Sequence, residues 1–224
     1  FLKINYAVSH KYFWVVFIWL ILVTYNYAFA DRDWEYWAQE SISIPVNKTI
    51  TYLILPEWRF KEDMHNVYLF KLETGPSFKI NNYLEITPYY TYQEKKSGVL
   101  WDRSDIVYLD GTVKAPFKKL FDTKLSNRLR YQYDFDKDKT TWRNVTKISK
   151  SFKITKSEIS PYISEEPFYD AKLDRITEHR TTAGIEYTFS KNFSMAIAYM
   201  LNSKKGMSKW AYTNVLVTNL KIKF

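Results

Sequence analysis

Residues 83–93 read YLEITPYYTYQ, a stretch in which apolar and polar side chains alternate. A period of two is typical of a β-strand with one buried face, because successive side chains point to opposite sides. One face of this stretch carries Leu84, Ile86, Pro88, Tyr90 and Tyr92. The alternation recurs in residues 127–134 and 180–189, and no dozen residues after Asp31 show a convincing 3.6-residue apolar repeat. The sequence therefore predicts an all-β fold.

Strand length narrows the fold class to a membrane barrel. Segments 49–60, 66–78 and 209–224 run 12 to 16 residues, and a tilted strand needs roughly 9 to 11 to cross a bilayer. In hydrocarbon every backbone N–H and C=O must be paired internally, which among β structures only a closed barrel achieves. We therefore expect an antiparallel up-and-down transmembrane β-barrel of 10 to 12 strands. The periodicity divides the chain into eleven strands, but bacterial single-chain barrels almost always have an even number, which favours 10 or 12.

The breaks between the predicted strands are of two kinds. Short turns are predicted at residues 46–48, 81–82, 116–120 and 190–192. Longer polar loops are predicted at residues 61–65, 94–102, 136–141 and 167–178. Short turns at one end and long loops at the other are typical of outer-membrane barrels. Tryptophans near the predicted strand ends are expected to form interfacial girdles; they are Trp34, Trp37, Trp58, Trp101, Trp142 and Trp210.

The first 30 residues have the order of a secretory signal peptide. A basic segment precedes an apolar run over residues 12–23, and Ala28-Phe29-Ala30 follows as a small-x-small cleavage site. The alternative is an inner-membrane anchor, because the run and the residues after it approach the roughly 20 needed to span a bilayer. We expect residues 1–30 to be a signal peptide and residues 31–224 to be one barrel domain in the bacterial outer membrane.

The last strand resembles the signal by which bacterial outer-membrane barrels are presented to their assembly machinery. It reads LVTNLKIKF over residues 216–224, and Leu220, Ile222 and Phe224 share one face. Period-two spacing shows only a strand, so the role as an assembly signal is what the resemblance implies. The barrel assembly machinery is accordingly an expected partner.

The chain as a whole, over roughly residues 33–224, resembles a family of bacterial outer-membrane β-barrels known as domain of unknown function 2490. The matching pieces are Trp34 to Trp37, Glu57-Trp58-Arg59, LETGPSFKINNYLEITPYYTY, Arg128-Leu129-Arg130, SPYISEEPFYD and HRTTAGIEYTFSKNFSMAIAYML. The resemblance implies a barrel and carries no established activity. The chain departs from the family in its many lysines, two of which, Lys221 and Lys223, lie in the last strand.

Placing the apolar faces outward predicts which charged residues line the lumen. The predicted lumen cations are Arg59, Lys71, Lys114, Arg128, Arg130, Arg180, Lys221 and Lys223. The predicted lumen anions are Glu57, Glu73, Glu85, Asp110, Asp134 and Glu186. Eight cations against six anions are nearly balanced, so we favour a lumen closed by ion pairs. The alternative is a narrow, porin-like path for small anionic solutes, since guanidinium groups pair well with carboxylate or phosphate.

Other function classes have weaker support. After the signal segment only His65 and His179 remain, no nucleophile setting stands out, and Glu165-Glu166 is expected at a loop edge facing solvent. Without cysteine no metal cluster is expected, and no cofactor or nucleic-acid motif is present. We therefore expect a non-enzymatic barrel whose basic rims face lipid and lipopolysaccharide phosphates. The alternatives are a barrel enzyme acting on lipid at the outer rim and a soluble exported β-sandwich that binds a ligand.

Overall fold

The computed structural model describes residues 34–117, 123–154 and 157–224, so the predicted signal peptide lies outside the described residues. Every element in the described part is a β-strand, and no helix there is long and apolar enough to cross a membrane. The strands are β1 (Trp34–Pro45), β2 (Ile50–Lys61), β3 (Asn66–Lys79), β4 (Leu84–Ser97), β5 (Leu100–Phe117), β6 (Thr123–Asp134), β7 (Lys139–Lys150), β8 (Phe152–Ile154), β9 (Ser157–Asp170), β10 (Arg175–Thr188), β11 (Phe193–Lys205) and β12 (Trp210–Lys223).

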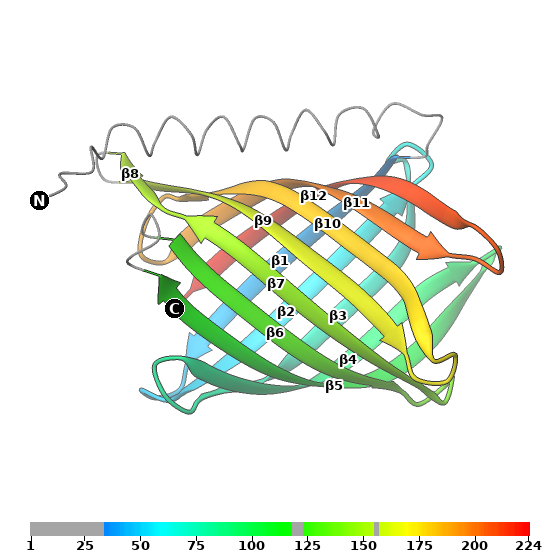
Figure 1. Ribbon diagram of the computed structural model, residues 1–224, viewed down its shortest axis with the longest axis horizontal. Helices are drawn as coiled ribbons and strands as arrows, with labels where there is room; N and C mark the ends of the chain where they lie inside the picture. Colours follow the sequence, from blue (N-terminus) through cyan, green and yellow to red (C-terminus); the bar gives the residue numbers. More distant parts are fainter. Residues whose placement is uncertain (1–33, 118–122, 155–156) are drawn as a thin grey trace, which may run out of the picture.

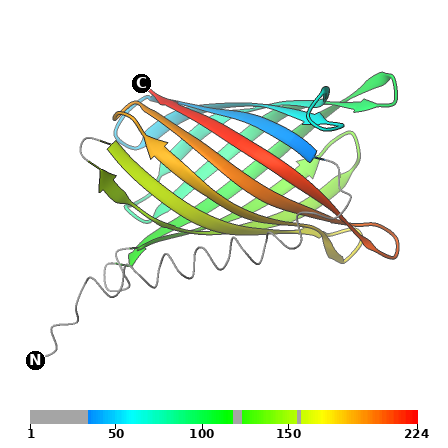
Figure 2. The ribbon, with the colours of Figure 1, turned by 90° about the horizontal axis from the view of Figure 1, so that it is seen from above.

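These strands form one closed barrel (Figures 1 and 2). Each of β1 to β7 pairs antiparallel with the next, β9 follows β7, and the series continues to β12. β12 then pairs with β1 in parallel over ten residue pairs, from Trp34↔Asn214 to Ser43↔Lys223, which closes the wall. A sandwich of two sheets, the soluble alternative, is therefore wrong for this chain.

The wall contains eleven strands, because the short β8 pairs only with the first residues of β9 and extends the edge that β7 begins. The predicted range of 10 to 12 strands is confirmed, whereas the preference for an even number is not met by the wall. In an up-and-down barrel with an odd number of strands, the first and last strands run in the same direction. The parallel closure of β1 on β12 is the direct consequence.

The two ends of the barrel are named here by the residues that lie at them. The Trp34 end carries the start of β1 and the turns 62–65, 98–99, 135–138, 171–174 and 206–209. The Phe224 end carries the C-terminus and the turns 46–49, 80–83 and 189–192. All of these turns are two to four residues long, so the prediction of long polar loops at one end is wrong.

Strand pairing continues through the charged segments that were predicted to be loops. Lys95 pairs with Asp102 and Lys96 with Trp101, so β4 and β5 stay paired to a two-residue turn. Charged side chains do not interrupt strand pairing, because the pairing is made by backbone hydrogen bonds. At the rim the charged side chains can still reach water. The turn at residues 62–65 is tight because Glu62, Asp63 and Met64 adopt φ of 55°, 52° and 69°, a region that Asp visits more readily than most residues.

The short turns predicted at the Phe224 end are confirmed where the structure describes them. Asn47 Oδ1 accepts the backbone N–H groups of Thr49 and Ile50, at 2.8 Å each. Asn81 Oδ1 accepts those of Tyr83 and Leu84, at 2.8 and 2.9 Å. Both asparagines thus replace backbone partners inside a tight turn. The predicted turn at residues 116–120 lies mostly outside the described residues, since β5 extends to Phe117.

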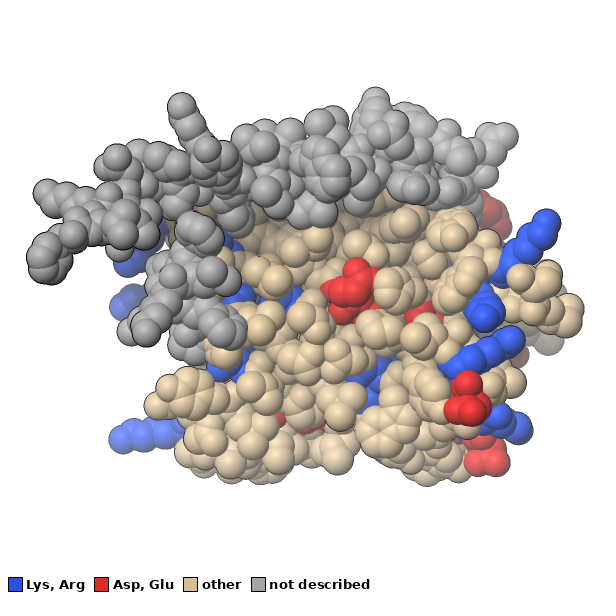
Figure 3. Space-filling view, in the orientation of Figure 1, with Lys and Arg blue, Asp and Glu red and all other residues tan. Residues whose placement is uncertain are grey.

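Alternation along each strand separates an inner from an outer face. In β4, Tyr89 and Thr91 are 9% and 0% exposed, while Tyr90 between them is 46% exposed. The outer wall presents large apolar side chains such as Leu109 and Leu129, and most Lys and Arg visible in Figure 3 lie toward the two ends. Trp37 contradicts its predicted place in an interfacial girdle: it is 1% exposed and packs inside the barrel.

Candidate functional site in the barrel lumen

Eleven charged residues of the inner face form a connected cluster, called here the lumen ion network. Its members are Glu57, Arg59, Lys71, Glu73, Asp110, Arg128, Arg130, Arg143, Glu166, Glu178 and Arg180. They come from β2, β3, β5, β6, β7, β9 and β10. Most lie in the half of the barrel nearer the Trp34 end, as Arg130, Arg143 and Glu166 show by standing four residues from the ends of their strands there.

The first part of the network follows directly from strand register. Glu57 pairs with Lys71 across β2 and β3, and alternation puts Arg59 and Glu73 on the same face. Lys71 Nζ lies 3.1 Å from Glu57 Oε2 and 2.7 Å from Glu73 Oε1. Glu57 also forms an ion pair with Arg59. All four side chains are buried, so each charge depends on the others for compensation.

Arg130 on β6 connects the four charged residues of β2 and β3 to Asp110 on β5. Its Nε and Nη2 donate to the two oxygens of Asp110, at 2.6 and 2.8 Å, which is the bidentate geometry of a strong pair. Its Nη1 lies 3.2 Å from Glu73 Oε2. Strands β3 and β6 are not neighbours, because β4 and β5 lie between them. The Arg130–Glu73 contact therefore crosses the lumen.

Glu166 organises the second part of the network. Arg143 donates to Glu166 Oε1 through Nη2 at 2.7 Å and Nε at 3.0 Å, and Arg180 Nη1 lies 3.6 Å from Glu166 Oε2. Arg180 also pairs with Glu178 at 2.6 Å. Arg128 links the two parts, because its Nη1 and Nη2 lie 3.6 Å from Asp110 and 3.5 Å from Glu166.

Aromatic rings fill the gaps between these guanidinium groups. The Trp37 ring has Arg59 Cζ 3.5 Å from its centroid and Arg180 Cζ at 4.8 Å. Phe168 similarly has Arg143 and Arg180 each at 4.4 Å. Cation–π contacts of this kind are favourable where the cation is desolvated. Ion pairs and rings together form a continuous chain of contacts among inner-face side chains in this half of the barrel.

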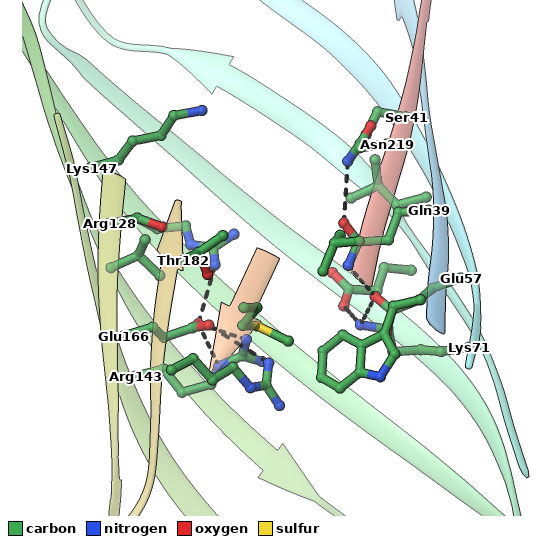
Figure 4. A pocket seen from close by; sticks show the side chains of 18 of the residues that line it. Gln39, Ser41, Glu57, Lys71, Arg128, Arg143, Lys147, Glu166, Thr182 and Asn219 are labelled. Atoms are coloured by element: carbon green, nitrogen blue, oxygen red, sulfur yellow. Dashed lines mark hydrogen bonds and ion pairs between the residues drawn. The ribbon is translucent and has the colours of Figure 1, made fainter. Parts of the chain in front are cut away.

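Beside the network lies a cavity of about 330 Å³, called here the lumen chamber (Figure 4). One side of it carries Ser41, Asn219 and Gln39, which form a hydrogen-bonded series. Ser41 Oγ donates to Asn219 Oδ1 at 3.1 Å, and Asn219 Nδ2 donates to Gln39 Oε1 at 3.3 Å. Gln39 Nε2 in turn donates to Glu57 Oε2 at 3.0 Å. Neutral amides thus connect this side of the chamber to the ion network.

The other side of the chamber is basic. It carries Arg128, which belongs to the network, and Lys147, whose Nζ lies 3.8 Å from the centroid of the Tyr162 ring. In the part of the chain that the structure describes, Lys147 forms no ion pair. Gly184 makes room for the Tyr162 ring, since a Cβ there would lie 2.9 Å from Tyr162 Cζ.

The structure places the eleven residues predicted as lumen-lining candidates on the inner face, but it does not bring all of them together. Eight belong to the ion network: Glu57, Arg59, Lys71, Glu73, Asp110, Arg128, Arg130 and Arg180. The other three have separate partners near the rims. Glu85 pairs with Lys114, Glu186 pairs with Lys221, each at 2.6 Å, and Asp134 pairs with Lys137 at 2.9 Å.

Sequence reasoning missed Arg143, Lys147, Glu166, Glu178 and the inward place of Trp37. The prediction that Glu166 stands at a solvent-facing loop edge is wrong, because β9 continues to Asp170 and turns Glu166 into the lumen. The alternation of SPYISEEPFYD already contained the signal, since it puts Glu166 on the face of Phe168. The prediction of a loop at residues 167–178 prevented this strand from being extended through Phe168.

The two histidines of the described residues lie apart in the fold, in a turn and on an outer face. His65 is in the turn between β2 and β3, where its Nδ1 lies 3.3 Å from Glu62 O. His179 is on the outer face of β10, with Nε2 2.7 Å from Glu165 Oε1. Within residues 34–117, 123–154 and 157–224, no group of three or more His, Asp or Glu is placed to hold a metal ion.

Comparisons with known proteins identify the family. No curated protein and no solved structure matches the chain. A family model described as protein of unknown function DUF2490 matches residues 34–213, which extends from the first strand of the barrel into the last. The chain with this closed barrel and charged lumen therefore belongs to the DUF2490 family.

Proposed function

We propose that the protein is an integral barrel of the bacterial outer membrane whose lumen is closed by its ion network. In this proposal it acts as a structural barrel in its resting state rather than as an open porin-like channel. The observation that carries the proposal is the set of contacts that cross the lumen, above all Arg130 on β6 with Glu73 on β3. Such contacts occupy the space through which a solute would pass.

The outer wall supports the membrane location. Large apolar side chains stand exposed along several strands, as Leu109, Leu129, Ile148, Ile185 and Ile197 do. An exposed apolar surface of this extent is costly in water and favourable in lipid. The closed ring of strand pairings leaves none of the eleven wall strands with a free edge over its paired length, as the hydrocarbon region requires, and only the short β8 is paired on one side among the described residues.

Two groups of polar side chains on the outer wall are paired internally. Asn127 Nδ2 donates to Asn144 Oδ1 at 3.0 Å and to Thr146 Oγ1 at 2.9 Å. Glu165 accepts from Thr181 at 3.2 Å and lies 2.7 Å from His179. Mutual pairing lowers the cost of placing these groups against lipid, because the cost of burying a polar group comes chiefly from lost hydrogen bonds.

An enzyme that acts on lipid at the outer rim is the second and weaker proposal. Glu165 and His179 form an acid–base pair, but the Thr181 hydroxyl donates to Glu165 rather than to His179. A hydroxyl nucleophile is normally activated by a hydrogen bond to its base. The geometry therefore favours a role for this group in the wall rather than in catalysis.

The proposed environment also suggests partners at the rim. Lys95, Lys96, Lys204 and Lys205 lie at the Trp34 end, close to the ends of β4 and β11. Cations there would attract the phosphates of lipopolysaccharide. Leu220, Ile222 and Phe224 would present the last strand to the barrel assembly machinery.

Two measurements test the proposal. The purified protein is inserted into a planar bilayer, and conductance is recorded in a salt gradient. We expect no discrete conductance steps from protein that is folded, with folding checked by a gel mobility shift on boiling. Regular steps with anion preference would replace the closed lumen with a conducting path. Recovery of the protein in the soluble fraction of cells, without detergent, would contradict the membrane location.

A further inference from the structure

The lumen chamber has a charge imbalance that the ion network does not remove. The ion network and the inner-face side chains of the chamber together hold seven cations and five carboxylates. The cations are Arg59, Lys71, Arg128, Arg130, Arg143, Lys147 and Arg180, and the carboxylates are Glu57, Glu73, Asp110, Glu166 and Glu178. Two positive charges therefore remain among these side chains of the lumen.

The contacts locate this excess at the chamber. Arg128 has only long ion pairs, at 3.5 and 3.6 Å, because Asp110 is bidentate with Arg130 and Glu166 is held by Arg143. The buried Nε of Arg128 has no hydrogen-bond partner among the described residues. The two carboxylates thus leave part of the hydrogen-bonding capacity of this guanidinium unused.

Lys147 is the second source of excess charge. Its contact within the described strands is the Tyr162 ring. The nearby carboxylate of Glu186 is already 2.6 Å from Lys221 Nζ and accepts from Ser194. A partly buried lysine on the inner face with no carboxylate of its own is an unusual arrangement, since charges withdrawn from water are normally paired.

Strand register brings the two cations close enough to share one ligand. Arg128 on β6 pairs with Val145 on β7, and Lys147 follows Val145 by two residues on the same inner face. Such diagonal neighbours have Cα atoms about 7–8 Å apart, within reach of long side chains. Figure 4 shows both side chains on one side of the chamber, facing the side that carries Ser41 and Asn219.

We propose that the lumen chamber is a binding site for a small solute that bears a phosphate or carboxylate group. Arg128 and Lys147 bind the oxyanion, Tyr162 forms an apolar wall beside it, and Ser41 and Asn219 offer hydrogen bonds to the polar remainder. The volume of about 330 Å³ lies at the lower end of ligand pockets, which suits a small ligand. This inference needs only the closed barrel, so it is independent of the proposed membrane location and of conductance.

Binding of inorganic phosphate and of citrate to the detergent-purified protein tests the site by isothermal titration calorimetry at constant ionic strength. Glucose is the neutral control. We expect saturable binding of at least one anion to the wild type. Lys147→Met should weaken it about tenfold or more, since a charge-assisted hydrogen bond is lost. This substitution removes no ion pair of the network, so the barrel should fold normally by circular dichroism and by gel mobility shift.

Three further variants make the result specific. Lys147→Arg should restore most of the affinity, because it keeps the charge. Arg128→Met should weaken binding as Lys147→Met does. Lys124→Met is the matched control, since it removes an inward cation whose side chain is 65% exposed near the Phe224 end, and it should leave affinity unchanged.

The outcomes separate the ligand classes. Binding of phosphate without citrate would identify a phosphoryl site, and the reverse a carboxylate site. Absence of saturable binding by either anion would overturn the inference. It would also be overturned if the wild type and Lys147→Met bound equally, since any heat would then come from adventitious ion association outside the chamber.

Discussion

The substitution Arg130→Met tests whether the ion network holds the lumen closed. The side chain of Arg130 is 3% exposed, is bidentate with Asp110 at 2.6 and 2.8 Å, and reaches Glu73 at 3.2 Å. Methionine replaces the aliphatic part of the arginine side chain but removes its positive charge from the buried carboxylates of Asp110 and Glu73. Glu73 retains Lys71 at 2.7 Å, whereas Asp110 retains only Arg128 at 3.6 Å. Removing one partner of a buried pair costs about 3–5 kcal/mol, and we expect a loss of that size.

The free energy of unfolding is measured by urea titration of the protein in lipid vesicles, with tryptophan fluorescence as the signal. Arg103→Met is the control, because Arg103 pairs with Asp105 at 3.0 Å but is 60% exposed, and exposed pairs contribute about 0–1 kcal/mol. Adding Asp110→Asn to Arg130→Met removes the uncompensated charge, so the double variant should be more stable than the single one. A loss below about 1 kcal/mol for Arg130→Met, equal to that of the control, would refute this account of the network.

Three other substitutions test the wall and the last strand. Leu129→Lys, on the outer face in the middle of β6, should cost about 2–4 kcal/mol in vesicles; an unchanged urea midpoint would show that this face does not meet lipid. Gly184→Ala should cost about 1–3 kcal/mol, because its Cβ would lie 2.6 Å from Ala198 Cβ and 2.8 Å from Ile197 O. Gly111→Ala is the control there, since nothing lies within 4 Å of its Cβ, and equal urea midpoints for the two would contradict the predicted crowding. Phe224→Ala should lower the amount of barrel assembled in cells while leaving refolding in detergent unchanged, and equal assembly would exclude a signal at this residue.

Much of the wall could be predicted from local pattern. The period of two fixes which side chains share a face, so Glu57, Lys71 and Arg130 could be placed in the lumen from their neighbours alone. Turn chemistry is equally local: Asn47 and Asn81 cap their turns through hydrogen bonds to residues two and three positions later. The charged segments were predicted to be loops because charged side chains are normally exposed to water. At the rim of a barrel, charged side chains can reach water while the backbone stays paired in a strand.

The arrangement of the lumen is decided only by closure of the barrel. The periodicity already divided the chain into eleven strands, but no local pattern encodes the parallel pairing of β12 with β1 that closes the wall. The contact of Arg130 with Glu73 joins residues 57 positions apart across the lumen, and Glu166 gathers Arg128, Arg143 and Arg180 from three strands. The sequence by itself determined that eight of the eleven charges of the ion network point inward. The tertiary structure decided that most of them neutralise one another, and that Arg128 and Lys147 retain unbalanced charge beside a cavity, because pairing across a lumen depends on distances that only the closed wall sets.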